Sequence, residues 1–282
     1  MRADLHMHSY YSDGRYSPTQ LVEYAAQNKL DIIALTDHDT TAGLAEARQC
    51  ARRFPSVRVI PGVEISTNCE DDELHILGYG IDDNTPRIKE LLKHAQENRK
   101  VRIHRMLHAL RTADILLDFE DVGNGSCSES LGRLHLARLL LRRGYVRTIR
   151  EAFEKYLSYD TDFMSYASTD FVSSQEAIDT ILDAGGLPVL AHPTISQFDR
   201  YIVPLVEYGL QGVEIFKRRR PSIEEFYLET VVKDKGLVIT GGSDWHGYHP
   251  TIALGKFFVD AARIIPFLER VNALQNVVDE KQ

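Results

Sequence analysis

The sequence predicts an α/β fold in which a mostly parallel sheet curls into a barrel and carries an inserted helical subdomain. Short apolar runs of strand length alternate with helix-length segments in residues 1–85 and 170–282. This alternation is typical of parallel sheets flanked by helices. It stops in residues 86–169, where helices are predicted in succession without strands. The seven apolar runs favour a closed or nearly closed barrel, with an open sheet as the alternative.

The composition is that of a globular protein with enough material for one large domain or slightly more. The chain has 282 residues, of which 43% are apolar and 26% are charged. The net charge of −8 argues against a broad surface for duplex DNA, which would be basic. Neither a signal peptide nor a membrane-spanning run is found. The three cysteines (Cys50, Cys69 and Cys127) form no C-x-x-C pair, so we expect reduced thiols and a cytoplasmic protein.

The first part of the chain is predicted to hold four strands and two helices. The strands are residues 2–8, 31–36, 57–64 and 74–79. The run 31–36 is continuously apolar, as expected of a strand buried on both faces of a parallel sheet. The first helix is predicted to begin with Ser17 as N-cap and Pro18 at its first position, and to end near Lys29. The second helix is predicted over residues 42–53.

The middle of the chain is predicted to be helical. Residues 86–112 form one long polar helix in this prediction, followed by helices over 131–144 and 148–157 and a turn at 123–126. Alternation resumes near Ser173 with a helix that ends at Gly185-Gly186, a plausible C-cap. Three further apolar runs begin at residues 187, 212 and 236, and helices are predicted between them over 198–208 and 222–234.

Histidines and acidic residues occur in or just after most of the predicted strands. His6 and His8 are two apart, so on a strand they point to the same face. The full set is His6, His8, Asp13, His38, Glu64, His75, His192, Asp244 and His246. Barrel enzymes place their chemistry at the carboxyl ends of the strands, and imidazole with carboxylate suits manganese, iron or zinc. Because these donors are too many for one ion, we expect two or three divalent ions bridged by carboxylates.

Five motifs in this order resemble the polymerase and histidinol phosphatase (PHP) family. They are residues 4–9 (DLHMHS), 36–39 (TDHD), 62–64 (GVE), 191–193 (AHP) and 243–246 (SDWH). The resemblance covers the whole chain except the helical insertion, where it is looser. It implies a distorted seven-stranded (β/α)7 barrel in residues 1–85 and 170–282, an insertion in 86–169 that covers the active site, and up to three divalent ions.

The resemblance also implies which residues hold each ion. The first ion would be held by His6, His8, Glu64 and Asp244. The second would share Glu64 and be completed by His75 and His135. The third would be held by Asp13, His38 and His246.

Further residues are implied as contacts to the substrate. Arg133 and His135 belong to an R-x-H-x-A-R segment, residues 133–138, which reaches over the mouth in related phosphatases. Arg133 would then face the substrate phosphate. His192 is expected to be a phosphate contact or proton donor rather than a metal ligand, and Lys155 is a further phosphate candidate. The candidate catalytic residues are therefore Asp13, Arg133 and His192.

The motifs are most similar to small phosphatases acting on nucleoside 3′,5′-bisphosphates. The resemblance implies a phosphomonoesterase that releases inorganic phosphate from a small phosphorylated nucleoside or sugar. The basic run 217–220 is either a solvated charge run or a contact to a second anionic group through Lys217 or Arg218. The alternative is a phosphodiesterase. The tail 247–250 (GYHP) resembles that of relatives that open cyclic sugar phosphates, and close relatives of the bisphosphate phosphatases trim short RNA from its 5′ end.

Two other classes fit the sequence less well. A non-catalytic metal-binding module would be missing ligands, and none is missing here. A C–N amidohydrolase usually carries a carbamoylated lysine at a strand end, and the fourth and fifth predicted strands contain no lysine. The sequence leaves the oligomeric state, the leaving group and the physiological metal open.

Overall fold

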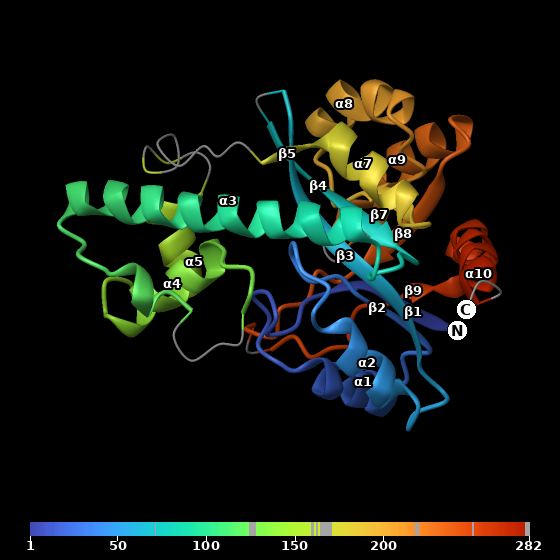
Figure 1. Cartoon of the computed structure of the whole chain (residues 1–282), viewed down its shortest axis with the longest axis horizontal. Coiled ribbons are helices and arrows are strands. Elements are labelled where there is room, and N and C mark those ends of the chain that lie inside the picture. The colour runs from blue at the N-terminus through green and yellow to red at the C-terminus, as the bar shows by residue number, and fades with distance from the viewer. Residues whose placement is uncertain are drawn as a thin grey trace.

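The computed structural model describes residues 1–70, 72–123, 128–158, 161, 163, 171–217, 220–249 and 251–279, with side chains up to 274. A twisted sheet surrounded by helices makes up one part of the molecule. A helical lobe lies at the far end of one long helix, α3 (Figure 1).

The sheet contains all seven predicted strands and two short additional ones. Its order is β8-β7-β6-β4-β3-β2-β1-β9, and β5 pairs with β3 beside this path. The strands are β1 (Arg2–Met7), β2 (Ile32–Leu35), β3 (Arg58–Cys69), β4 (Asp72–Tyr79), β5 (Val172–Ser173), β6 (Leu187–Leu190), β7 (Gly212–Lys217), β8 (Val238–Gly242) and β9 (Val259–Asp260).

The two ends of the sheet approach each other at β1 and β8, so the barrel is nearly closed. The amide of His8 donates to the carbonyl of Trp245 across 3.0 Å, and Met7 forms a parallel bridge with the same residue. Gly242 permits this approach, since a Cβ on it would lie 2.5 Å from the backbone nitrogen of His6. The closure brings the last strand against the first, where the histidine pair lies.

The expected parallel sheet is wrong at one strand. β4 runs antiparallel to both of its neighbours, β3 and β6, and β9 runs antiparallel to β1. A parallel crossover needs a dozen or more residues. Here β3 continues to Cys69 and β4 begins at Asp72, so only a tight turn joins them, with Glu70 at a φ of +53°. His75 consequently reaches the mouth from the first half of its strand.

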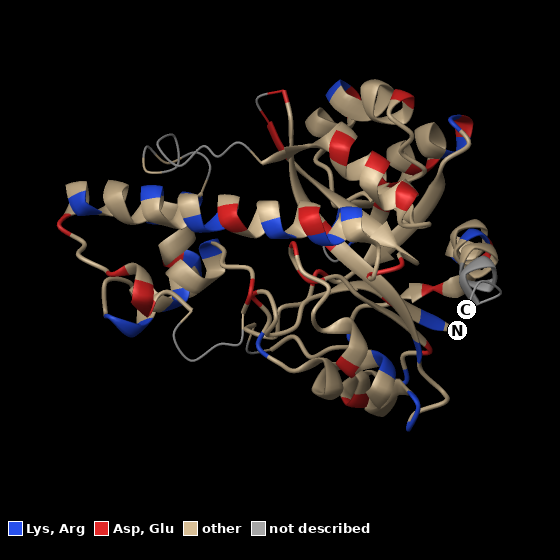
Figure 2. Cartoon of the chain, in the orientation of Figure 1, with Lys and Arg blue, Asp and Glu red and all other residues tan. Residues whose placement is uncertain are grey.

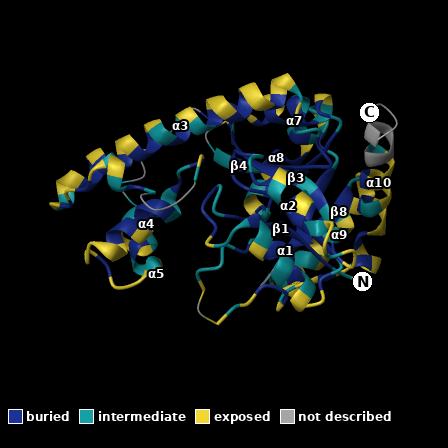
Figure 3. Cartoon of the chain, turned by 60° about the horizontal axis from the view of Figure 1, so that its bottom comes forward, coloured by how far each residue is buried: buried dark blue, intermediate teal, exposed yellow. Residues whose placement is uncertain are grey.

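Six helices flank the sheet: α1 (Pro18–Gln27), α2 (Leu44–Ala51), α7 (Ser174–Asp183), α8 (Ile195–Glu207), α9 (Ser222–Asp234) and α10 (Ile265–Asp279). The predicted cap of α1 is confirmed, since the amide of Gln20 donates to the Ser17 hydroxyl over 3.0 Å. Sequence analysis did not predict α10, which packs Phe267 edge-on against the buried ring of Tyr79. Figure 3 shows the buried residues concentrated on the strands and the helix faces toward them.

The helical insertion has a hydrophobic cluster of its own. Its helices are α3 (Pro86–Leu110), α4 (Arg133–Arg142) and α5 (Ile149–Ala152), with 3-10 turns η1 (Arg111–Ala113) and η2 (Phe119–Asp121) and the π-turn η3 (Phe153–Leu157). The cluster joins the far half of α3 to α4 through residues such as Ile103, Leu107, Leu136 and Leu140. This separate cluster supports the predicted boundaries 86–169, which stay a prediction. Residues 124–126 of the predicted turn lie outside the described residues.

Charge is spread along the long helix rather than gathered on one face. Figure 2 shows acidic and basic residues on the half of α3 near the sheet and only basic residues on the half toward the helical lobe. None of the described helices is long and apolar enough to span a membrane. Cys50 and Cys69 are free thiols, and Cys127 lies outside the described residues.

We predict that Gly242→Ala lowers the free energy of unfolding by about 2 kcal/mol or more, because its methyl group would meet backbone atoms of His6 that cannot give way. Urea unfolding measures the loss. Gly185→Ala is the matched control. It has a φ of +69° but nothing within 4 Å of its Cβ, so only backbone strain of about 1 kcal/mol is expected. Equal losses in both variants would contradict the close approach of β8 to β1.

Candidate metal centre

One buried carboxylate, that of Glu64, lies at the centre of the histidine cluster. Five imidazoles contact it, and they come from four strands or the loops after them, with His6 and His8 both from β1. The distances to Glu64 Oε2 are 3.1 Å from His6 Nε2, 3.3 Å from His8 Nε2 and 3.1 Å from His38 Nδ1. The distances to Glu64 Oε1 are 2.8 Å from His75 Nδ1 and 2.9 Å from His192 Nε2.

Three groups of side chains have donor atoms close enough to hold an ion. The groups are His6, His8, Glu64 and Asp244; His8, Asp13, His38 and His246; and His38, Glu64 and His75. Within each group the donor atoms lie within 4.8 Å of one another, and most of the residues are buried. Buried acids and imidazoles at such distances fit divalent cations, because burial without a partner would be costly. The first group matches the expected first set, and the second contains the expected third set.

The ionisable side chains of the cluster strongly shift one another's pKa values. Burial alone would raise the pKa of the Glu64 carboxyl, but the imidazoles around it, chiefly those of His38, His6 and His75, hold this pKa well below its usual range. Burial lowers the pKa of His75, yet Glu64 outweighs it and raises that pKa to about 9. Likewise Asp13 overcomes burial and raises the pKa of His246 to about 10. Protons therefore balance these acids where no cation does, and a bound cation must displace them.

A second layer of acids fixes the imidazoles and the loops that carry the donors. Glu214 accepts from His6 Nδ1 at 3.1 Å, which leaves His6 Nε2 directed at Glu64. Asp4 accepts from the amide and the hydroxyl of Ser243, at 2.8 and 2.7 Å, and so holds the turn before Asp244. Carboxylates behind metal-ligating histidines set their tautomer and orientation in this way.

Asp37 plays the corresponding part for the loop that carries Asp13. It accepts from the amide and the hydroxyl of Ser9, both at 2.6 Å, and from the hydroxyl of Ser12 at 2.7 Å. The loop is thereby held beside the end of β2.

The backbone is strained at three residues around the site. His192, Asp244 and Asp39 have φ values of +30°, +51° and +50°, although none is a glycine. Such conformations cost energy and are found where the surroundings enforce them, often at functional sites. The strain at His192 turns its side chain from the end of β6 toward Glu64.

His192 and His135 differ from the sequence-based expectation. His192 was expected to contact phosphate rather than metal, yet its Nε2 lies on the same Glu64 oxygen as His75. His135 was expected beside His75, but it belongs to none of the three groups. Its Nδ1 accepts from the amide of Gly132 at 3.1 Å, and burial lowers its pKa to about 4. Neither His192 nor His135 belongs to the three donor groups, so the expected roles of both residues stay predictions.

A cleft of about 430 Å³ opens above the cluster. Its floor includes the donors Asp13, His38, His75, His192, Asp244 and His246. Its opposite wall comes from the insertion and includes Arg99, Arg102 and Arg133. Arg133 therefore faces the site as expected. The guanidinium of Arg99 pairs with Asp39, and that of Arg102 with Glu73, which in turn contacts His75 Nε2 at 3.3 Å.

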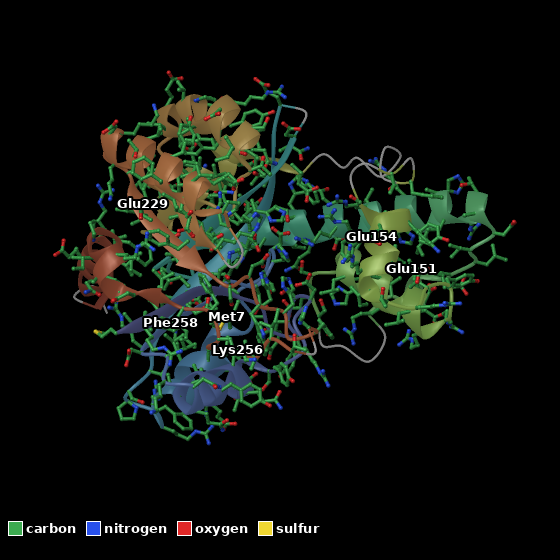
Figure 4. The ribbon with its side chains drawn as sticks, turned by 180° about the vertical axis from the view of Figure 1, so that it is seen from behind. Met7, Glu151, Glu154, Glu229, Lys256 and Phe258 are labelled. Atoms are coloured by element: carbon green, nitrogen blue, oxygen red, sulfur yellow. The ribbon has the colours of Figure 1, made fainter. Side chains whose placement is uncertain are left out.

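The remaining predicted substrate contacts lie elsewhere. Lys155 is not among the residues that line the cleft, because its ammonium group pairs with Glu151 at 2.6 Å across one helical turn. Figure 4 labels Glu151 and Glu154 on the insertion, well away from Met7 in the barrel. Lys217 ends β7 and does not line the cleft either. Arg218 lies outside the described residues.

Sequence reasoning missed Glu214 and the arginines of α3. Glu214 is fully buried inside an apolar strand, in the run Gly212-Val213-Glu214-Ile215, which repeats the GVEI of residues 62–65. That repetition was a usable signal. The sequence carried no such signal for Arg99 and Arg102, because a charged residue on a long polar helix is usually solvated. These two side chains are buried only because α3 crosses the mouth of the barrel.

The model of the PHP domain matches residues 4–159 of the chain. Three curated relatives have different activities. A 3′,5′-nucleoside bisphosphate phosphatase of Chromobacterium violaceum is 34% identical over 86% of this chain and 86% of its own. The 5′-3′ exoribonuclease Rnm of Escherichia coli is 32% identical over 90% and 88%. A phosphoribosyl 1,2-cyclic phosphate 1,2-diphosphodiesterase of Eggerthella lenta is 35% identical over 88% and 95%.

A solved structure agrees with the fold. An amidohydrolase from Chromobacterium violaceum with bound sulfate and no metal superposes with a TM-score of 0.86 at 31% identity, over 97% of both chains. The expected PHP-type barrel is thus confirmed. The chain belongs to the PHP family and is a metal-dependent hydrolase of phosphate esters.

Proposed function

We propose that the cluster holds two or three divalent ions around Glu64. His6, His8 and Asp244 complete the first set with Glu64. His75 and His192 complete the second, and Asp13, His38 and His246 form the third. The observation that carries the proposal is the burial of one carboxylate among five imidazoles. Manganese, iron and zinc suit this mixture of nitrogen and oxygen donors.

The substrate we propose is a phosphomonoester of a small phosphorylated nucleoside, of the nucleoside 3′,5′-bisphosphate type. The cleft has the size of a small-molecule site. Both the metal donors and Arg133 line it, so a phosphate group can be held by bound ions and by a guanidinium. The bisphosphate phosphatase among the relatives supports this choice.

The side chains of the cleft then have separate tasks. Bound ions would supply Lewis acidity and lower the pKa of an attacking water. Arg133 binds the phosphoryl oxygens and stabilises the charge that develops on them. His192, Asp13 and His246 all serve as ligands in this proposal, so we assign the proton for the leaving oxygen to a water molecule in the cleft that they line.

A phosphodiesterase acting on a cyclic sugar phosphate or on 5′ ends of short RNA is the second candidate. It is supported by the relatives with those activities and by residues 247–249 of the tail, which line the cleft.

We expect the manganese-loaded protein to release inorganic phosphate from adenosine 3′,5′-bisphosphate faster than it turns over the alternatives. The assay compares phosphate release from this substrate with opening of ribose 1,2-cyclic phosphate and shortening of a 5′-phosphorylated RNA. Metal-free protein is the control and should be inactive. If the protein turned over only the cyclic ester or only the RNA, the proposed phosphomonoesterase activity would be wrong and the second candidate would be supported.

We predict that Glu214→Gln weakens metal binding by about 10–100-fold, because His6 loses the carboxylate that orients it and raises its basicity. Metal titration of the metal-free protein followed by calorimetry measures the change. Glu64→Gln should lose more metal, since it removes the shared ligand itself.

Glu97→Gln is the matched control, because Glu97 lies on the outer face of α3, pairs only with Lys100 and is 58% exposed. It should bind metal as the wild type does. If Glu214→Gln behaved like this control, the orienting role of Glu214 would be wrong.

A further inference from the structure

Two residues of the sequence motifs have no role so far. Arg138 ends the R-x-H-x-A-R segment on α4, and Tyr248 lies in the tail after β8. In the structure the guanidinium carbon of Arg138 lies 4.6 Å from the centre of the Tyr248 ring. The pair joins the helical insertion to the barrel.

A second pocket, of about 360 Å³, lies beside this pair. One side of it is formed by α4, with Arg138, Leu139 and Arg142, and another by Asp121. Tyr248 lines both this pocket and the metal cleft, so the two spaces are neighbours at this residue. A molecule that places a phosphate in the cleft can therefore extend past Tyr248 into the second pocket.

The chemistry of the pocket suits a flat aromatic ring with polar edges. The Tyr248 hydroxyl donates to the carbonyl of Gly14 at 3.4 Å, which orients the ring. The guanidinium carbon of Arg138 lies over the Tyr248 ring, so the cationic group contacts the face on which a base could stack. Arg138 is exposed, and no described carboxylate forms a salt bridge with it, so its side chain can move aside.

We propose that this pocket is a nucleobase subsite. The base stacks on Tyr248 and Arg138 covers its other face, while a phosphate of the same molecule lies in the cleft. The inference rests on the proposed function and narrows the substrate to nucleotides, in preference to sugar phosphates without a base. Stacking on aromatic rings and contact with a guanidinium are general means of holding bases of any sequence.

Kinetics on two monoesters test the subsite. We compare kcat/KM for adenosine 3′,5′-bisphosphate with kcat/KM for ribose 5-phosphate, which has no base. Tyr248→Ala should lower the ratio of the two at least about tenfold, mainly through the KM of the nucleotide. Arg138→Ala should lower the ratio about threefold.

Two matched variants should keep the ratio. Tyr248→Phe retains the ring, and Arg150→Ala removes an arginine that is 85% exposed on α5 and paired with Glu154. An equal loss on both substrates in Tyr248→Ala would show that Tyr248 only shapes the cleft and would overturn the subsite. If Tyr248→Ala does not fold, the ratio in Arg138→Ala decides.

Binding of adenosine 5′-monophosphate, measured by calorimetry on metal-loaded protein, separates the two proposals. Binding that weakens in Tyr248→Ala without any phosphate release from nucleotides would support the subsite and contradict the proposed function. Phosphate release from nucleotides with an unchanged ratio in Tyr248→Ala would support the function and contradict the subsite.

Discussion

The burial of the Glu64 carboxylate is the constraint on which the rest of the structure depends. This side chain is inaccessible to solvent, and five imidazoles from four strands converge on its two oxygens. A carboxylate in such a place is stable only if cations or protons balance it. Glu64 raises the pKa of His75 to about 9, which favours a proton on that imidazole where metal is absent. The same geometry is a cage for divalent ions.

Several features of the fold serve this convergence rather than the stability of the barrel alone. The last strand can approach the first because Gly242 has no side chain, and this contact brings Asp244 toward His6 and His8. The positive φ values of His192 and Asp244 are energetically unfavourable backbone conformations, which the surrounding hydrogen bonds maintain. Behind the donors, Glu214 fixes the direction of His6. These features of the barrel thus position the donor side chains at its mouth.

The structure brings most of the predicted donor side chains together, and the sequence indicated them because they lie in or just after apolar runs. The sequence did not predict that β4 runs antiparallel to β3. Both strands extend beyond their apolar runs, so the apolar pattern does not reveal that only two residues lie between them. The contact of His192 with Glu64 was not predicted, because a strand-end histidine before Pro193 gives no sign of its positive φ. The arginines of α3 were missed because their burial depends on how the helix crosses the barrel. The spacing of residues along the sequence predicts which side chains reach one edge of the sheet. The direction of a strand and the path of a helix depend instead on tertiary packing.

Anomalous diffraction from crystals of the manganese-loaded protein, recorded at the absorption edge of the metal, tests the central claim most directly. The account predicts at least two peaks, both adjacent to the carboxylate of Glu64 and separated by about 3.5–4 Å. A single peak, or peaks that do not flank Glu64, would contradict it.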